Sequence, residues 1–295
     1  MSVNDRRFAL ILFFVVPAAL VSNMVAARWI AGSIPPVATA FWRWGLTLIF
    51  LLPFAASAMW RGREEIRREW RSYLLLGFLG MGICGAPTYV AGVTTTATNA
   101  GLIYAACPVL IVLFARFGYG EAIGWARMAG IALALAGAGW ILLRGEPSNI
   151  VHLNFVEGDL LIALGAVAWA IYSVQLKYKR TTFDPMTRLA TIVAFGVAVN
   201  LPFLIGEMAF YAMPNYDLRD WTVFVFLALV PGIMSYLGYS IVVGALGAGA
   251  ASLLMYLVPL YGPALAWIVL DERLAIYHLV GAAMLLPGLY LGTRR

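Results

Sequence analysis

Long, nearly uncharged apolar runs recur along the whole sequence, separated by short polar or charged stretches. A helix needs about 20 apolar residues to cross a bilayer, and most of the runs have that length. A transmembrane β-barrel would show short segments of alternating polarity instead. The runs therefore predict an all-α membrane protein with ten transmembrane helices. We place them at 8–31, 37–59, 72–93, 97–117, 124–143, 158–177, 185–206, 221–243, 248–270 and 275–292.

Composition argues against the soluble alternatives. Of the 295 residues, 63% are apolar and 12% are charged, whereas a soluble domain is about 45–50% apolar and about 25% charged. A soluble globule of this length could not bury so much apolar surface, and a disordered chain needs low hydrophobicity. The net charge of +6 would suit a nucleic-acid partner. We expect none, because loop arginines in a membrane protein report its orientation.

The basic residues gather on one side of the predicted helices. Most of the 20 Lys and Arg residues lie near the two termini and in the connections around 61–71, 116–127 and 177–188. The positive-inside rule makes this side cytoplasmic. We therefore expect a multi-pass inner (plasma) membrane protein with both termini in the cytoplasm. The first run is too long for a signal peptide, whose apolar core has about 7–15 residues.

The second half of the chain repeats features of the first. At an offset of 149, Leu52-Pro53-Phe54 aligns with Leu201-Pro202-Phe203. We therefore predict two five-helix units, 1–145 and 155–295. Because five is odd, the second unit enters the membrane from the opposite side, as in the inverted repeats of secondary transporters. At an offset of 151, the aligned pairs are Trp70 with Trp221, Pro108 with Pro259, Glu121 with Glu272, Gly130 with Gly281 and Gly137 with Gly288.

These paired positions resemble the EamA-type branch of the drug/metabolite transporter superfamily. The resemblance rests on the series Pro108-Glu121-Gly130-Gly137 and Pro259-Glu272-Gly281-Gly288, with Arg43 in ATAFWRWGL and Trp169 in GAVAWAIYSV. It covers essentially the whole chain. One departure is Leu20, which stands opposite Trp169 where the family usually carries a tryptophan. The resemblance implies a carrier of small metabolites, with amino acids prominent among the substrates and export as the expected direction.

Catalytic and cofactor motifs are not evident in the sequence. His152 and His278 are far apart and lack metal-ligand spacing, and the surroundings of Ser235 lack the spacing of a nucleophile elbow. Cys84 and Cys107 lie inside apolar runs, as small core residues do. We expect no enzyme activity, no cofactor and no metal, with a membrane-embedded enzyme as the minor alternative.

Charges inside the spans are costly and tend to be functional. Arg43 lies about seven residues into the second predicted helix, roughly 10 Å deep at 1.5 Å per residue. It could attract a substrate carboxylate, or it could be a structural arginine that snorkels outward or pairs with a helix-end carbonyl. Glu121 and Glu272 precede helices on opposite membrane faces, where we expect them to cap the helix N-terminus. The alternative is a gating ion pair with Arg127 or Arg273.

Polar and aromatic residues at mid-span are the remaining substrate-binding candidates, because small-molecule sites combine apolar walls with a few placed polar groups. Each could also serve in packing or in an interfacial belt. Together they would suit a substrate with an apolar side chain, whose polar end would meet hydroxyl and N–H groups. The candidates are Asn23, Tyr89, Asn99, Tyr104, Trp169, Tyr172, Tyr239 and Tyr256.

Pro108 and Pro259 interrupt the fourth and ninth predicted helices at matching positions. A proline removes a backbone donor and frees a carbonyl one turn earlier. Such a break is tolerated in a membrane where a neighbouring helix or a cavity satisfies the freed group. The two prolines could be hinges for alternating access or static kinks.

Taken together, the sequence predicts an exporter of amino acids, aromatic or other apolar ones, or of related metabolites. The alternative is an uptake carrier or facilitator for another small metabolite, such as a nucleobase, a nucleotide sugar or a quaternary amine. The expected partners are the small-molecule substrate and the lipid bilayer, with the protein as a monomer or homodimer.

Overall fold

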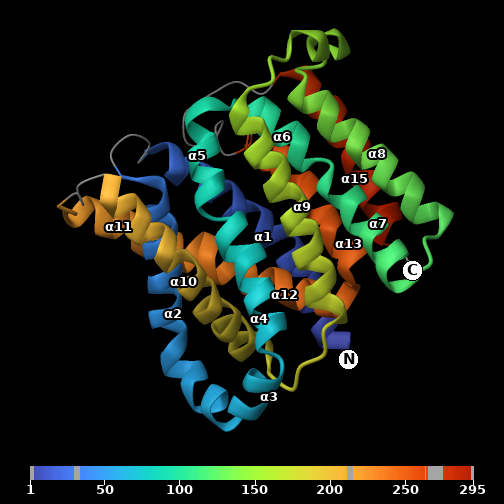
Figure 1. The fold of residues 1–295 in the computed structure, drawn as a ribbon. Helices are drawn as coiled ribbons and strands as arrows, with labels where there is room; N and C mark the ends of the chain where they lie inside the picture. The colour runs from blue at the N-terminus through green and yellow to red at the C-terminus, as the bar shows by residue number, and fades with distance from the viewer. Residues whose placement is uncertain (1–2, 30–33, 211–214, 263, 265–274, 294–295) are drawn as a thin grey trace.

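A computed structural model of the chain describes residues 3–29, 34–210, 215–262, 264 and 275–293. Over these residues the chain is helical, without β-strands. Figure 1 shows the helices packed into one bundle. The first unit contains α1 (Val3–Trp29), α2 (Pro36–Arg61), α3 (Arg63–Arg68), α4 (Trp70–Gly77), η1 (Phe78–Ile83), α5 (Ala86–Thr94), α6 (Ala97–Tyr104), α7 (Cys107–Tyr119) and α8 (Trp125–Leu142).

The second unit follows the connecting turn η2 (Pro147–His152). It contains α9 (Glu157–Tyr178), α10 (Pro185–Phe210), α11 (Leu218–Leu227), η3 (Ala228–Met234), α12 (Ser235–Leu246), α13 (Ala248–Ser252), η4 (Leu253–Leu257) and α15 (Ile276–Thr293). Glu272 and Arg273, and most of the end of the predicted ninth helix, lie outside the described residues.

The helices have the lengths that a bilayer requires. Within the described ranges, nine helical stretches are long and apolar enough to cross a membrane, and Ala248–Gly262 is a shorter apolar helix. Each of the nine overlaps one of the predicted spans. The shorter one begins where the predicted helix 248–270 begins. The predicted fold class, an all-α membrane protein, is confirmed.

The contact between α8 and α15 shows how the two units are related (Figure 1). A Cβ on Gly130 would lie 2.6 Å from the Gly288 carbonyl oxygen, and a Cβ on Gly137 would lie 2.7 Å from the Gly281 carbonyl oxygen. The two helices are therefore antiparallel. Gly130 is equivalent to Gly281, and Gly137 is equivalent to Gly288. Exchanging the two units therefore converts one contact into the other, as a two-fold axis requires. Small residues let these backbones approach closely.

The second inter-unit pair, α2 and α10, is also antiparallel. Near the end of α10, the Glu207 carboxylate accepts hydrogen bonds from the backbone N–H groups of Val37 (3.0 Å) and Ala38 (2.8 Å) at the start of α2. At the other end, the Phe183 ring lies where a Cβ on Gly62 would be. Both inter-unit pairs thus agree with the predicted inverted repeat.

Both third spans contain a π-helical segment, and the two segments overlap when the repeats are aligned. With the offset of 151, Phe78 at the start of η1 corresponds to Leu229 in η3. The fourth spans are broken in the same way, between α6 and α7 and at η4. Pro108 is the second residue of α7, directly after the first break, and Pro259 follows η4 by two residues. The interruptions thus occur at both prolines.

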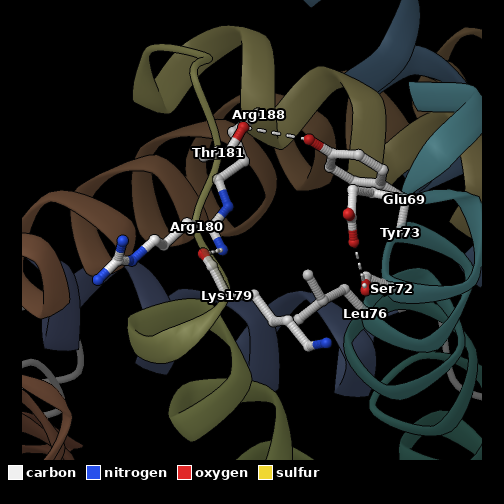
Figure 2. A pocket seen from close by; sticks show the side chains of 8 residues that line it. All are labelled: Glu69, Ser72, Tyr73, Leu76, Lys179, Arg180, Thr181 and Arg188. Carbon is white, nitrogen blue, oxygen red and sulfur yellow. Dashed lines mark hydrogen bonds between the residues drawn. The ribbon is translucent and has the colours of Figure 1, made fainter. Parts of the chain in front are cut away.

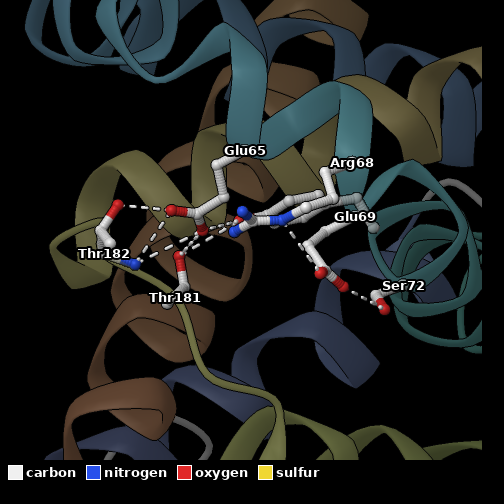
Figure 3. Close-up of polar contacts among 7 residues, drawn as sticks. Glu65, Arg68, Glu69, Ser72, Thr181 and Thr182 are labelled. Carbon is white, nitrogen blue, oxygen red and sulfur yellow. Dashed lines mark hydrogen bonds and ion pairs between the residues drawn. The ribbon is translucent and has the colours of Figure 1, made fainter.

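One end of the bundle holds most of the basic residues, in the stretches 61–71, 116–127 and 177–188. We call it the basic end. Glu65 of α3 joins the two units there, since it accepts hydrogen bonds from the Thr181 hydroxyl (2.6 Å), the Thr182 backbone N–H (3.1 Å) and the Tyr73 hydroxyl (3.1 Å) (Figure 3). Burial would raise the pKa of Glu65, but these hydrogen bonds outweigh it and lower the pKa below its ordinary value.

Candidate substrate site

Arg43 of α2 is the centre of a buried polar group. Its side chain is 3% exposed. Nη1 donates to Asn23 Oδ1 of α1 (3.2 Å) and to the Tyr89 hydroxyl oxygen of α5 (3.2 Å), and Nη2 donates to the Pro231 carbonyl oxygen of η3 (2.9 Å). The Tyr89 hydroxyl also donates to Asn23 Oδ1 (2.9 Å). Three of the predicted site residues therefore meet at one point.

The backbone of η3 explains why a carbonyl is free at this place. Pro231 lies inside the π-helical segment, where the regular ladder of hydrogen bonds is disturbed. The Thr47 hydroxyl, one turn after Arg43, lies 3.3 Å from the Ala228 carbonyl oxygen. A Cβ on Gly232 would lie 2.6 Å from Thr47 Oγ1. Glycine is thus required for α2 to approach η3 this closely.

The Arg43 charge is not neutralised by a carboxylate in the described part of the chain. Its Nε is buried and has no hydrogen-bond partner in the ranges that the structure describes. The guanidinium carbon lies 4.4 Å from the centre of the Trp44 ring and 6.0 Å from that of Tyr236, at the distances of cation–π contacts. Arg43 does not snorkel outward, because its hydrogen bonds all point into the bundle.

The Trp44 and Tyr236 rings lie beside Arg43. With Trp169, Tyr172 and Tyr239, which pack on Tyr236 or on Trp169, they form what we call the aromatic cluster. None is more than 5% exposed. The Tyr236 ring centroid is 4.8 Å from that of Trp44 and 5.4 Å from that of Trp169. Trp169 also lies 4.9 Å from Tyr239 and 5.5 Å from Tyr172, centroid to centroid. The cluster joins α2 of the first unit to α9 and α12 of the second.

Some polar atoms of the aromatic cluster are already bonded within the protein. The Tyr239 hydroxyl donates to Ser173 Oγ (2.8 Å), and the Tyr236 hydroxyl donates to the Gly80 carbonyl oxygen of η1 (2.8 Å). The Tyr172 hydroxyl and Trp44 Nε1 are buried and have no hydrogen-bond partner in the described part of the chain. A buried polar group without a partner costs free energy. These two groups, with Arg43 Nε, keep hydrogen-bonding capacity that the described part of the chain does not use.

Three predicted substrate-binding residues lie apart from this site. The Asn99 amide donates to Asp159 Oδ2 (2.8 Å) and to the Asn154 carbonyl oxygen (2.9 Å) at the end of the bundle opposite the basic end. Tyr104 directs its hydroxyl toward Gly165. Tyr256 is fully buried in η4. Among the described residues, no ring contact or hydrogen bond joins Tyr104 or Tyr256 to the aromatic cluster.

Sequence reasoning missed several residues of the site. Trp44 and Tyr236 contact Arg43, while Thr47 and the Pro231 carbonyl hold α2 against η3. Tyr236 stands one helical turn before Tyr239, so the helical spacing could have indicated it. The Pro231 carbonyl had no comparable signal, because its availability depends on the π-helical backbone.

Glu121 forms an ion pair rather than a helix cap. The α8 N-cap position is Gly124, which has no side-chain cap, and Glu121 lies in the connection before it. Its carboxylate is 2.9 Å from Arg127 Nη1 and accepts a hydrogen bond from the Tyr178 hydroxyl (2.5 Å). The Tyr178 ring stacks on Tyr119, with 4.0 Å between centroids. This is the Arg127 pairing of the alternative hypothesis. Glu272 lies outside the described residues.

Metal ligands do not gather in the part of the chain that the structure describes: no group of three His, Cys, Asp or Glu side chains is close enough to hold an ion. The site consists of one cation, neutral hydrogen-bonding groups and aromatic faces.

Comparisons with known proteins agree with this architecture. The chain is 23% identical over 262 residues to the uncharacterized transporter YyaM of Bacillus subtilis, covering 89% of this chain and 86% of that one. It is 26% identical to a protein of Streptantibioticus cattleyicolor named "Probable terminal-alkyne amino-acid exporter", over 79% of this chain and 76% of that one.

A protein of Escherichia coli named "Probable amino-acid metabolite efflux pump" is 24% identical over 66% of each chain. A solved crystal structure matches with a TM-score of 0.72 and 22% identity, covering 96% of this chain and 95% of that one, and so shares the fold. The profile of the EamA-like transporter family matches twice, at residues 7–143 and 156–294. The chain therefore belongs to the EamA-like transporter family.

Proposed function

We propose that this protein exports amino acids, aromatic or other apolar ones, or closely related metabolites by alternating access. The observation that carries the proposal is the buried Arg43 beside the aromatic cluster. Within the described ranges, its charged group contacts only neutral partners. One part of this site suits a carboxylate and the other suits an apolar side chain.

The Arg43 guanidinium is the proposed anchor for the substrate carboxylate. A buried cation with neutral partners alone has lost its hydration without gaining a counter-charge, so an anionic oxygen should bind it favourably. A guanidinium can hold a carboxylate through two parallel hydrogen bonds. Because Nε has no hydrogen-bond partner among the residues that the structure describes, a bound carboxylate would satisfy it.

The remaining groups suit the rest of an amino acid. Asn23 Oδ1 already accepts two hydrogen bonds, from Arg43 and from Tyr89. The Tyr89 hydroxyl oxygen and the Pro231 carbonyl oxygen each accept one from Arg43, and each can accept a second from an ammonium group. The faces of Trp169 and Tyr236 would contact an apolar or aromatic side chain. The free Tyr172 hydroxyl would allow a substrate with one polar group.

Direction and mechanism are supported by two relatives and by the paired interruptions of the helices. Two relatives carry names that describe export of amino acids or their metabolites, and they support export here. The paired breaks at Pro108 and Pro259 would serve as hinges, and the Glu121–Arg127 pair with Tyr178 would gate the basic end. The excess of Lys and Arg at that end supports an inner-membrane orientation with both termini in the cytoplasm.

The proposal can be tested with the purified protein in liposomes. We expect saturable counterflow of apolar and aromatic amino acids, and weaker counterflow of the corresponding amines that lack the carboxylate. Flux that rises linearly with concentration would instead indicate a facilitator. Movement of nucleobases or quaternary amines, with none of amino acids, would contradict the proposed substrate class.

The Arg43→Gln variant tests the carboxylate anchor. It should lose discrimination between an amino acid and its decarboxylated amine, because the counter-charge is gone. Arg116→Gln is the matched control, since Arg116 is an exposed arginine near the end of α7 and should keep the discrimination of the unmodified protein. Equal discrimination by both variants would remove Arg43 from the proposed site.

A further inference from the structure

A small pocket at the basic end lies between the two units, away from Arg43. Figure 2 shows it between the first turns of α4 and the connection from α9 to α10. Its lining includes three cations, Lys179, Arg180 and Arg188, and one carboxylate, Glu69, with Ser72 beside it. The pocket therefore carries an excess of positive charge.

The internal contacts of the pocket compensate this charge only in part. Glu69 pairs with Arg68 (3.6 Å) and accepts a hydrogen bond from the Ser72 hydroxyl (3.5 Å). Within the described ranges, no carboxylate lies at ion-pair distance from Lys179, Arg180 or Arg188. The three cations can therefore bind an anion from outside the chain.

The hydrogen bonding of the Arg188 guanidinium is a second indication that the pocket binds a ligand. Its Nη1 and Nη2 donate to the carbonyl oxygens of Leu176 (2.7 Å) and Lys179 (2.9 Å), which end α9. Its Nε is buried and has no hydrogen-bond partner among the described residues. An oxygen of a bound anion would satisfy this N–H without disturbing the two bonds that position the side chain.

The position of the pocket along the membrane spans indicates which kind of anion would reach it. It lies where the span Trp70–Thr94 begins, Glu157–Tyr178 ends and Pro185–Phe210 begins. Trp70 is exposed at the same level, as is usual for aromatic residues among lipid headgroups. One to two turns deeper on the same span, Leu75 and Phe78 are about 40% exposed and can contact acyl chains. Basic pockets between helices at this level bind anionic headgroups.

We propose that this pocket binds the phosphate of an anionic phospholipid headgroup, with Lys179, Arg180 and Arg188 around the phosphate oxygens. The lipid would bridge α4 of the first unit and the α9–α10 connection of the second. It would thus support the same junction that Glu65 makes through Thr181 and Thr182. The proposal is independent of what the protein transports.

The first test is lipid retention by the purified full chain. The protein is exchanged into a neutral detergent, supplied with phosphatidylglycerol or phosphatidylcholine, and examined by native mass spectrometry and thermal unfolding. We expect one retained phosphatidylglycerol per chain and a higher melting temperature than with phosphatidylcholine. Equal retention and stabilisation by the two lipids would overturn the proposal. The same melting shift with millimolar inorganic phosphate would assign the pocket to a soluble anion and overturn the lipid.

The second test uses basic residues with matched controls. The double variant Lys179→Gln/Arg180→Gln should bind phosphatidylglycerol about 30-fold more weakly, since each surface cation contributes roughly a factor of five to such binding. Lys177→Gln, on the exposed side of α9 outside the pocket, should lose no retained lipid. An equal loss in both variants would indicate non-specific attraction and contradict the site. Retention by the unmodified chain decides the first test even if the double variant folds poorly.

Discussion

At the scale of one residue, removal of the Tyr89 hydroxyl would test the polar half of the substrate site. The hydroxyl contacts both Asn23 and Arg43 and so fixes the direction of the guanidinium. In Tyr89→Phe the ring remains and one hydrogen-bonding group is lost, which costs about 1 kcal/mol. We expect the KM for transport to rise about fivefold with little change in maximal rate. The measurement is concentration-dependent uptake into liposomes.

Tyr73→Phe is the control for this prediction. It also removes a hydrogen-bonded hydroxyl, but at the basic end, where Tyr73 donates to Glu65. It should leave the KM unchanged. If both variants raised the KM equally, the effect of Tyr89 would be one of general stability and the hydroxyl would have no place in the substrate site.

Glu65 gives a prediction on pH dependence. Its folded-state pKa is lowered below the usual value of 4.5 by the bonds to Thr181, Thr182 and Tyr73, which outweigh burial. The stabilisation is therefore present above about pH 4.5 and is lost as the pH falls through the folded-state pKa. Glu65→Gln should be less stable than the unmodified protein at pH 7, by about 1–2 kcal/mol, and the difference should shrink in acid.

Thermal unfolding at several pH values measures this difference. Glu64→Gln is the matched control, because Glu64 is exposed and makes only a surface ion pair with Arg67 at 3.4 Å, of a kind worth little. The difference in stability between Glu65→Gln and the unmodified protein could instead stay constant from pH 7 to pH 4. That result would show that the carboxylate charge does not fasten α3 to the second unit.

Site residues were only partly predictable, because side-chain contacts depend on distant partners. The sequence placed Asn23, Arg43 and Tyr89 on separate helices at suitable depths, and they meet. Asn99 had an equally polar, helical setting, yet it binds Asp159, sixty positions later in the chain. Nothing local distinguishes an asparagine that faces a substrate from one that faces an aspartate.

At the scale of elements, the glycines of α8 decide how closely it packs on α15. A Cβ at Gly130 would lie 2.4 Å from the Gly292 backbone nitrogen, and backbone cannot move aside cheaply. Gly130→Ala should therefore destabilise the protein by about 1–3 kcal/mol. Gly139→Ala, on the same helix but with no atom within 4 Å of the new Cβ, should be neutral or stabilising, since alanine favours helix over glycine by about 1 kcal/mol.

Thermal unfolding in detergent compares these two variants directly. Gly137→Ala serves as a second disruptive change, because its Cβ would lie 2.7 Å from the Gly281 carbonyl oxygen. Equal melting temperatures for Gly130→Ala, Gly137→Ala and Gly139→Ala would show that α8 and α15 do not approach through these glycines.

Helix spans were predictable, and their internal irregularities were not. Bilayer thickness fixes the length of a span, so apolar runs mark the helices. The π-helical segments η1 and η3 have no comparable signal, because their free carbonyls are satisfied by distant groups such as Arg43, Tyr236 and Asn200. The prediction that Glu121 caps a helix was wrong for the same reason. Glu121 precedes α8 in the sequence, but in the fold its carboxylate bonds to Arg127 and Tyr178 and not to the helix N-terminus.

At the scale of the whole molecule, the inverted arrangement gives equivalent residues opposite positions across the membrane. Arg67 and Leu218 are equivalent at the offset of 151. Both are exposed, Arg67 in the connection after α2 and Leu218 at the start of α11. In right-side-out vesicles, an impermeant maleimide should label Leu218→Cys directly and Arg67→Cys only after permeabilisation. The unmodified chain is the blank, since its Cys84 and Cys107 lie within membrane-spanning stretches.

The outcomes of this labelling separate the architecture from the orientation. Labelling of both variants from one side would overturn the inverted repeat, and with it the equivalence of α8 with α15 and of α2 with α10. Labelling of Arg67→Cys from outside and Leu218→Cys from inside would keep the repeat but place the basic end outside the cell. That result would also move the proposed Glu121 gate from the cytoplasmic to the external side.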